Sequence, residues 1–168
     1  EIIQAINQED LSVAQAVQLE LSAIEALCDK AAEAILNGGR IFYIGAGTSG
    51  RIGILDASEC PPTFGVPHGM VVGLIAGGDS AIRKAVEFAE DSKDQAWDDL
   101  KAYAINKKDI VIGLAASGTT PYVLGGLEAC KKEGIPTGSI TCNKNSPIDI
   151  IADYPVCVVV GPEFITGS

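Results

Sequence analysis

Apolar residues recur at helical spacing near the start of the chain. Over residues 11–36 they repeat every three or four positions, and the run ends at the Asn-Gly-Gly of 37–39, a strong helix stop. A shorter stretch over residues 2–7 has the same pattern. The sequence therefore predicts a long amphipathic N-terminal helix with a short helix before it.

Five short apolar runs follow, rich in β-branched residues and without regular polar alternation. This is typical of parallel strands buried on both faces. Helical stretches are expected between them, over 50–58, 80–90, 91–104 and 121–132. Strands that alternate with helices predict an α/β fold, a doubly wound five-stranded parallel sheet with helices on both faces. The runs are "RIFYIGA", "MVVGLIA", "DIVIGLAAS", "PTGSITC" and "YPVCVVV".

The expected strand order locates a ligand site. In an open sheet of the flavodoxin-like order 2-1-3-4-5, ligands bind beyond the carboxyl ends of the strands, where the order reverses. The segment "GAGTSGR" follows the first strand and "AASGTTP" follows the third. We therefore expect these two loops to be neighbours.

Composition narrows the class of protein. With 168 residues, 47% of them hydrophobic, the chain suits one globular domain. A net charge of −10 with 12 Lys and Arg argues against nucleic acid or an anionic membrane as partner. The five cysteines are an odd number without CxxC spacing, which suggests neither a disulfide framework nor a zinc site and fits a reducing cytoplasm.

The first loop admits two interpretations. Gly45, Gly47 and Gly50 match G-x-G-x-x-G, but the acid that a dinucleotide site needs about 20 residues later is not at that spacing. The alternative is a phosphate cradle, in which Thr48 and Ser49 add hydroxyls to the N–H groups of a helix N-terminus.

The second loop has similar chemistry. Over residues 117–121, Ser-Gly-Thr-Thr-Pro opens the next expected helix. Taken alone, each loop is explained by ordinary helix capping, whereas two such loops where the strand order reverses favour phosphate binding.

Two acidic segments are candidates for catalysis. Asp56 and Glu59 lie three residues apart on the helix after the first loop, and the Cys-Pro-Pro of 60–62 is expected to end that helix and so keep Glu59 near the ligand crevice. A second acidic run over 87–91 ends another expected helix. The pattern alone leaves a solvated helix surface as the alternative and does not choose among these acids.

Longer motifs point to a family. "GRIFYIGAGTSGRIGILDASECPPTFGV", "VVGLIAGGDSAIRKAVEFAEDS", "GLAASGTTPYV" and "VVVGPEFITGS" closely resemble the bacterial N-acetylmuramic acid 6-phosphate etherases of the sugar isomerase (SIS) superfamily. The resemblance implies cleavage of the D-lactyl ether of this sugar phosphate to N-acetylglucosamine 6-phosphate and D-lactate, during cytoplasmic cell-wall recycling. It implies a homodimer and no cofactor or metal.

The resemblance also assigns residues. It implies Glu59 of "ASEC" as the acid that protonates the leaving lactate and Glu90 of "AEDS" as the base at C2. The family usually has arginine where this chain has Thr119, which changes one expected contact. The sugar phosphate is expected to lie on Thr48, Ser49, Ser117, Gly118, Thr119 and Thr120.

Family members continue beyond "GPEFITGS" into a C-terminal helical region, so residues 1–168 are expected to be a fragment, a single SIS domain with N-terminal helices at 1–37. A sensing module for hexose phosphates, as in the glucokinase regulatory protein, is the alternative. The presence of both Glu59 and Glu90 favours the enzyme, and Thr119 leaves binding without catalysis open. A dinucleotide oxidoreductase is a third, more distant alternative.

Overall fold

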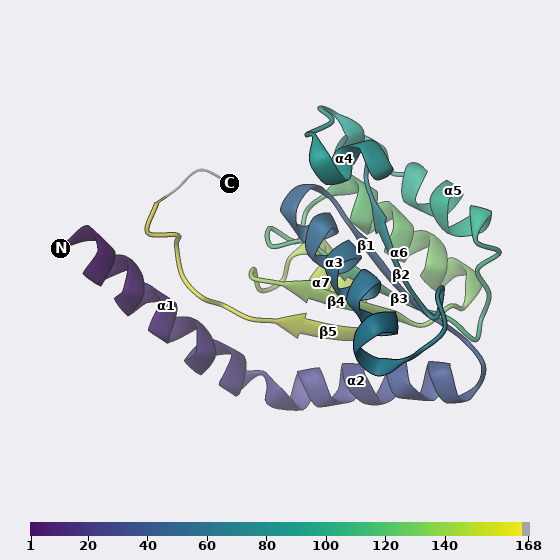
Figure 1. Ribbon diagram of the computed structural model, residues 1–168, viewed down its shortest axis with the longest axis horizontal. Helices are drawn as coiled ribbons and strands as arrows, with labels where there is room; N and C mark the ends of the chain where they lie inside the picture. Colours follow the sequence, from purple (N-terminus) through teal and green to yellow (C-terminus); the bar gives the residue numbers. More distant parts are fainter. Residues whose placement is uncertain (166–168) are drawn as a thin grey trace.

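The computed structural model describes residues 1–165, so the last three residues of "FITGS" lie outside the described part. Its centre is a sheet of five parallel strands in the order β2-β1-β3-β4-β5 (Figure 1). This confirms the predicted fold class and strand order. The strands are β1 (Ile41–Gly45), β2 (Val71–Ile75), β3 (Ile110–Leu114), β4 (Thr137–Thr141) and β5 (Tyr154–Cys157).

Side chains of β1 alternate between two packed faces. Phe42 and Ile44 are fully buried in the main core, against α5 (Gln95–Ala102), α6 (Pro121–Glu133) and α7 (Pro147–Ile151). Ile41 and Tyr43 point to the opposite face, which is covered by α2 (Leu21–Leu36) and α3 (Gly47–Phe64). Helices on both faces are what a parallel sheet requires.

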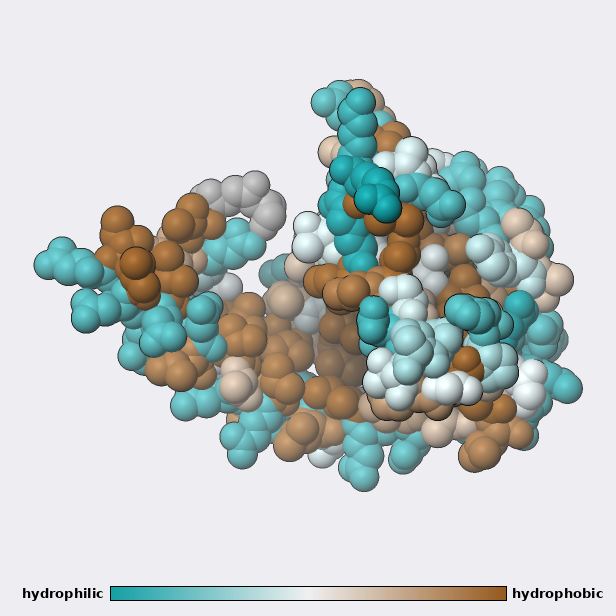
Figure 2. Space-filling view, viewed as in Figure 1, coloured by the Kyte–Doolittle hydropathy of each residue, from teal (hydrophilic) through white to brown (hydrophobic). Residues whose placement is uncertain are grey.

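The N-terminal helix is interrupted. α1 (Ile2–Leu19) and α2 meet at Glu20 with a bend of 63°, where the sequence predicted a continuous helix over 11–36. No residue of α1 is buried, and the helix extends away from the sheet as an arm with apolar side chains along it (Figures 1 and 2). Within residues 1–165, no single helix is long and apolar enough to cross a membrane, and only this bent pair has the combined length and composition.

α3 is twice as long as predicted. It begins at Gly47 and continues through Pro61 and Pro62 to Phe64, so the expectation that these prolines end the helix was wrong. The fixed φ of proline is itself helical, and the packing of α3 on the sheet offsets the hydrogen bonds lost with the two missing N–H groups. The helix ends instead at Gly65, which is left-handed and donates its N–H to the Pro61 carbonyl oxygen at 2.9 Å.

The helix predicted over 80–90 is largely absent. α4 (Asp79–Arg83) ends after five residues, and η1 (Ala89–Asp91) is a single 3₁₀ turn. The reason is a tertiary contact. The Arg51 guanidinium binds the carbonyl oxygens of Ala81 and Ile82, the acceptors that the next helical turn would need. α5 is also shorter than predicted, and α7 was not predicted.

Candidate functional site

The glycines of the first loop permit a close approach of α3 to the sheet. A Cβ on Gly50 would lie 2.6 Å from Ile75 Cγ1, and one on Gly45 would lie 2.7 Å from the Gly50 nitrogen. Gly47 has φ +53° and begins the helix. The glycines therefore allow the backbones of the loop and α3 to pack closely. This packing places the free N–H groups of the first turn of α3 at the carboxyl edge of the sheet. Thr48 is exposed there and Ser49 is half-buried.

The second loop is a tight hydroxyl-rich turn. Gly118 has φ +71° and donates its N–H to the Ala115 carbonyl oxygen at 3.0 Å. The Ser117 Oγ accepts from the Thr119 hydroxyl at 3.1 Å and from the Thr119 N–H at 3.3 Å. Both side chains are exposed, and Thr120 is the half-buried residue before α6. The turn thus presents several hydroxyl groups together.

The two loops leave adjacent strands at the same edge. β1 pairs with β3, and Gly45 lies opposite Leu114 in the register. Hydrogen bonds from the end of β4 also fix the start of the second loop. The Thr141 hydroxyl and the Asn143 amide both donate to the Ala116 carbonyl oxygen, at 3.1 and 3.0 Å. The predicted neighbourhood of the two loops is therefore confirmed.

A small pocket of about 220 Å³ lies beside the first loop. Its floor is formed by the loop and the end of β2, and its wall by residues 85–90. Glu87 and Glu90 both line it and are exposed. The structure therefore places Glu90, of the two glutamates singled out from the sequence, next to Gly47.

Arg51 is the residue that sequence reasoning overlooked. Its Nε donates to the Ile82 carbonyl oxygen and its Nη2 to that of Ala81, both at 2.9 Å. It is also the one cation among the described residues that line this pocket. Arg51 thereby fastens α4, which leads into the acidic wall, to the first turns of α3. Arg51 is visible in "GAGTSGR", but its partners lie about thirty residues away. They are backbone carbonyl oxygens, which no residue type in the sequence reveals.

Glu59 lies elsewhere. It follows Gly47 by twelve residues along one continuous helix, which places it about 18 Å from the glycine loop at the usual rise per residue. It is exposed, near the end of α3 that approaches α2 rather than α4 (Figure 1). The expectation that Glu59 stays near the crevice was wrong, because twelve residues of helix already separate it from Gly47 before the prolines are reached. One copy of the chain does not bring Glu59 and Glu90 together.

Asp56 has a structural partner. Burial, together with a hydrogen bond to the Asp56 carboxylate, raises the pKa of Tyr43 above its usual range. Burial, and secondarily the charge of Asp56, also raises the pKa of the Cys60 thiol. The Cys60 thiol is thus kept in its protonated, poorly nucleophilic form.

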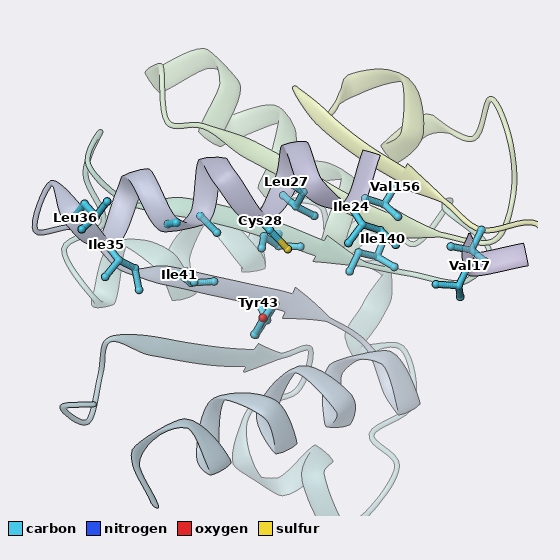
Figure 3. Close-up of a pocket in the computed structure, with 14 residues that line it drawn as sticks. Val17, Ile24, Leu27, Cys28, Ile35, Leu36, Ile41, Tyr43, Ile140 and Val156 are labelled. Carbon is cyan, nitrogen blue, oxygen red and sulfur yellow. The ribbon is translucent and has the colours of Figure 1, made fainter. Parts of the chain in front are cut away.

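A larger cavity is remote from this chemistry. An apolar groove of about 770 Å³ lies between α2 and the sheet (Figure 3). Val17, Ile24, Leu27, Ile140 and Val156 are among its lining residues, and Tyr43 and Cys28 supply its few polar atoms. Without cations or a set of hydrogen-bond donors, the groove is unsuited to a phosphate. Among residues 1–165, no group of three or more His, Cys, Asp or Glu is placed to hold a metal ion.

Comparison with known proteins identifies the fold family. The family model described as "Glucokinase regulatory protein N-terminal SIS domain" matches residues 22–131. The chain belongs to this SIS-domain family. Among solved structures, the SIS domain is similar to phosphoheptose isomerase GmhA from Neisseria gonorrhoeae, with a TM-score of 0.74 at 14% identity, covering 97% of this chain and 86% of that one. It is also similar to the Vibrio vulnificus NanR protein complexed with ManNAc-6P, with a TM-score of 0.64 at 13% identity, covering 98% and 55%.

A nearer relative in sequence is the N-acetylmuramic acid 6-phosphate etherase of Christiangramia forsetii. It is 57% identical over all 168 residues of the SIS domain, which span 61% of the length of that relative. The match includes both loops, the acidic wall of the pocket and all of α3. The two isomerase-fold structures establish the fold alone, whereas this relative establishes close kinship with the etherases.

Proposed function

We propose that the protein is an N-acetylmuramic acid 6-phosphate etherase, which releases D-lactate and N-acetylglucosamine 6-phosphate. The observation that carries this proposal is the 57% identity to the Christiangramia forsetii etherase over the whole chain. The pocket with Glu90, beside two loops rich in N–H and hydroxyl donors, has the polar groups that such a substrate needs.

The reaction explains why two carboxyl groups are required. In the open-chain sugar the lactyl oxygen on C3 is β to the C1 aldehyde, so the C2 proton is acidic. A base removes this proton, the electron pair forms the C2–C3 double bond, and the C3–O bond breaks as an acid protonates the departing oxygen. Water then adds to C3 of the unsaturated aldehyde, and C2 regains a proton. Glu90 is the base at C2, and Glu59 is the acid toward lactate.

The phosphate is held at the carboxyl edge of β1 and β3. The N–H groups of the first turn of α3 and the loop hydroxyls are neutral donors that accept an anion despite the net charge of −10. The binding residues are Thr48, Ser49, Ser117, Gly118, Thr119 and Thr120.

The enzyme acts in the cytoplasm as a homodimer. Residues 1–168 form a single phosphosugar-binding domain of a cytoplasmic homodimer that acts in cell-wall recycling. Its ligand is a small sugar phosphate, in keeping with the ManNAc-6P held by the Vibrio vulnificus protein of the same fold. Nucleic acid and membrane surfaces are not among its partners.

A second candidate is a regulatory module that binds a hexose phosphate without converting it. The match to the SIS domain of the glucokinase regulatory protein favours this alternative. Thr119 is compatible with it, because an arginine contact usual in the etherases is replaced by a neutral hydroxyl.

The test is an assay of D-lactate released from N-acetylmuramic acid 6-phosphate. The protein is expressed at the full length of its etherase relatives, with residues 1–168 assayed alongside. Release of lactate by the full-length protein supports the etherase. Tight binding of the sugar phosphate with no release would replace the etherase by the regulatory module.

A further inference from the structure

We propose that Phe88 and Val86 form an apolar subsite for the acetyl group of the substrate, and that Phe88 thereby selects an N-acetylated sugar phosphate over one with a free amine. This inference rests on the proposed function, in which Glu90 acts at C2, the carbon that carries the acetamido group. It adds a specificity-determining residue to the pocket that Glu90 lines.

Phe88 has an unusual backbone conformation. It is left-handed, with φ +61° and ψ −1°, a region that bulky side chains rarely occupy. The ring gains no burial in return, because the residue is 78% exposed. Backbone strain of this kind persists only where the surrounding structure imposes it, and it is concentrated at functional sites. Core packing therefore does not explain why an aromatic side chain stands here.

The neighbours of Phe88 hold its segment against the sheet. Val86 and Ala89 both approach Gly77, just beyond the end of β2, where an added Cβ would lie 3.1 Å and 3.2 Å from their Cβ atoms. The Phe88 carbonyl oxygen accepts the Asp91 N–H at 3.2 Å and so closes the turn η1, which contains Glu90. Phe88 and Glu90 therefore belong to one anchored turn, and the ring is left on the outside of it.

The pocket brings the ring together with the proposed base. Phe88, Val86 and Glu90 all line it. Much of the remaining lining consists of small apolar side chains, those of Ala46, Ala76, Ala81, Ala85 and Ala89. At about 220 Å³ the pocket is smaller than the roughly 300–1,000 Å³ of a site that encloses a whole ligand. It therefore suits one substituent of a sugar phosphate, and an apolar one.

The chemistry of the reaction indicates which substituent this is. The substrate has two methyl groups that an aromatic ring could cover, one in the acetamido group on C2 and one in the lactyl group on C3. As the base, Glu90 must reach the C2 proton at hydrogen-bond distance, about 3 Å. Phe88 lies two residues before Glu90 in the same turn. We therefore assign the acetyl methyl on C2 to the ring.

Charge alone would favour a different ligand. Glu87 and Glu90 both line the pocket, and a free amine on C2 is a cation at neutral pH that these carboxylates attract. An apolar surface reverses this preference, because it gains a contact with the acetyl methyl and removes water from an ammonium group. The exposed ring of Phe88 supplies such a surface beside the two acids.

The test compares N-acetylglucosamine 6-phosphate with glucosamine 6-phosphate, which lacks only the acetyl group. Isothermal titration calorimetry with the full-length wild-type protein should show tighter binding of the acetylated sugar. Phe88→Ala and Phe88→Gly should each weaken that sugar about three- to tenfold, as expected for the loss of one apolar contact, and change the binding of the amine by less than about twofold. Phe64→Ala, at an aromatic residue 74% exposed at the far end of α3, is the matched control and should change neither dissociation constant.

The two substitutions at residue 88 separate the ring from the backbone. Glycine suits the left-handed conformation, whereas alanine keeps its strain, so equal effects would assign the selectivity to the ring. An effect of Phe88→Ala alone would assign it to the backbone and overturn the subsite. A greater loss for the amine would indicate a cation–π contact and also overturn it.

Two further outcomes distinguish the subsite from the proposed function. Equal binding of the two sugars by the wild type, or a raised KM for N-acetylmuramic acid 6-phosphate with unchanged binding of both sugars in the Phe88 variants, would overturn the acetyl subsite and leave the etherase intact. Failure of the wild type to release lactate, with the preference for the acetylated sugar present and lost in both variants, would overturn the etherase and support the subsite.

Discussion

Arg51 donates from Nε to the carbonyl oxygen of Ile82 at 2.9 Å, and this contact joins the first turns of α3 to α4, the element before the segment that carries Glu90. A second hydrogen bond, from Nη2 to the carbonyl oxygen of Ala81, makes the contact bidentate. The contact both ends α4 and turns the following residues toward the pocket. Arg51 is thus a positioning residue for the proposed base.

Replacement of Arg51 should separate catalysis from binding. We expect Arg51→Ala to lower the kcat of lactate release at least about tenfold, the equivalent of 1.4 kcal/mol in the barrier, with a smaller change in KM. Arg51→Lys should restore little of the lost kcat, because an ammonium group lacks the planar guanidinium geometry that reaches two carbonyl oxygens. Arg83→Ala, at an exposed arginine of α4, is the control. Equal kcat values for Arg51→Ala and the wild type would remove this role.

The close packing of α3 on β2 should be sensitive to a single methyl group. A Cβ on Gly73 would lie 2.7 Å from the Ile54 Cα and 2.8 Å from its nitrogen, where only backbone movement relieves the contact. We expect Gly73→Ala to lower the free energy of unfolding by about 1–3 kcal/mol in urea. Thr63→Ala, at an exposed position of α3, should change it by less than about 0.5 kcal/mol. A free energy of unfolding of Gly73→Ala equal to that of the wild type would show that α3 can move away from β2 at little cost.

The hydroxyls of the second loop should matter for binding. Hydrogen bonds to a charged group contribute about 1.5–3 kcal/mol each. The double variant Ser117→Ala, Thr120→Ala should therefore weaken the binding of N-acetylglucosamine 6-phosphate at least tenfold. Isothermal titration calorimetry measures the change, with Ser22→Ala on the exposed surface of α2 as control. A dissociation constant equal to that of the wild type would exclude this loop from the phosphate site.

The cysteines should react very unequally. Burial raises the pKa of the Cys130 thiol to about 12, so at pH 8 it stays protonated as well as shielded. Cys28 is exposed on α2. A disulfide reagent at pH 8 should therefore modify Cys28 in the native protein and Cys130 only after unfolding, as peptide mass spectrometry can show. Native-state modification of Cys130 as fast as that of Cys28 would contradict the buried position.

The sheet could be predicted from local pattern because five β-branched runs between helical stretches admit few topologies. The loops could be placed together for the same reason, since strand order determines which carboxyl ends meet. The missed features depend on contacts distant in sequence. The break after α4 arises from Arg51, and the reach of α3 through Pro61 and Pro62 arises from packing that offsets their missing N–H groups.

The place of Glu59 depends on where α3 begins. Twelve residues of helix separate Glu59 from Gly47, wherever the helix ends after them, and this places Glu59 far from Glu90 within one chain. The motif proposes the two residues, and the structure places them far apart within one chain.

The most direct test of the account is the release of D-lactate from N-acetylmuramic acid 6-phosphate by the full-length protein, measured beside Glu59→Gln and Glu90→Gln. Both substitutions remove a proton-transfer group from an exposed position, so folding and phosphosugar binding should be nearly unchanged. We predict rapid release by the wild type and release reduced to background in each variant. Undiminished release in either variant, or binding without release by the wild type, would contradict the account.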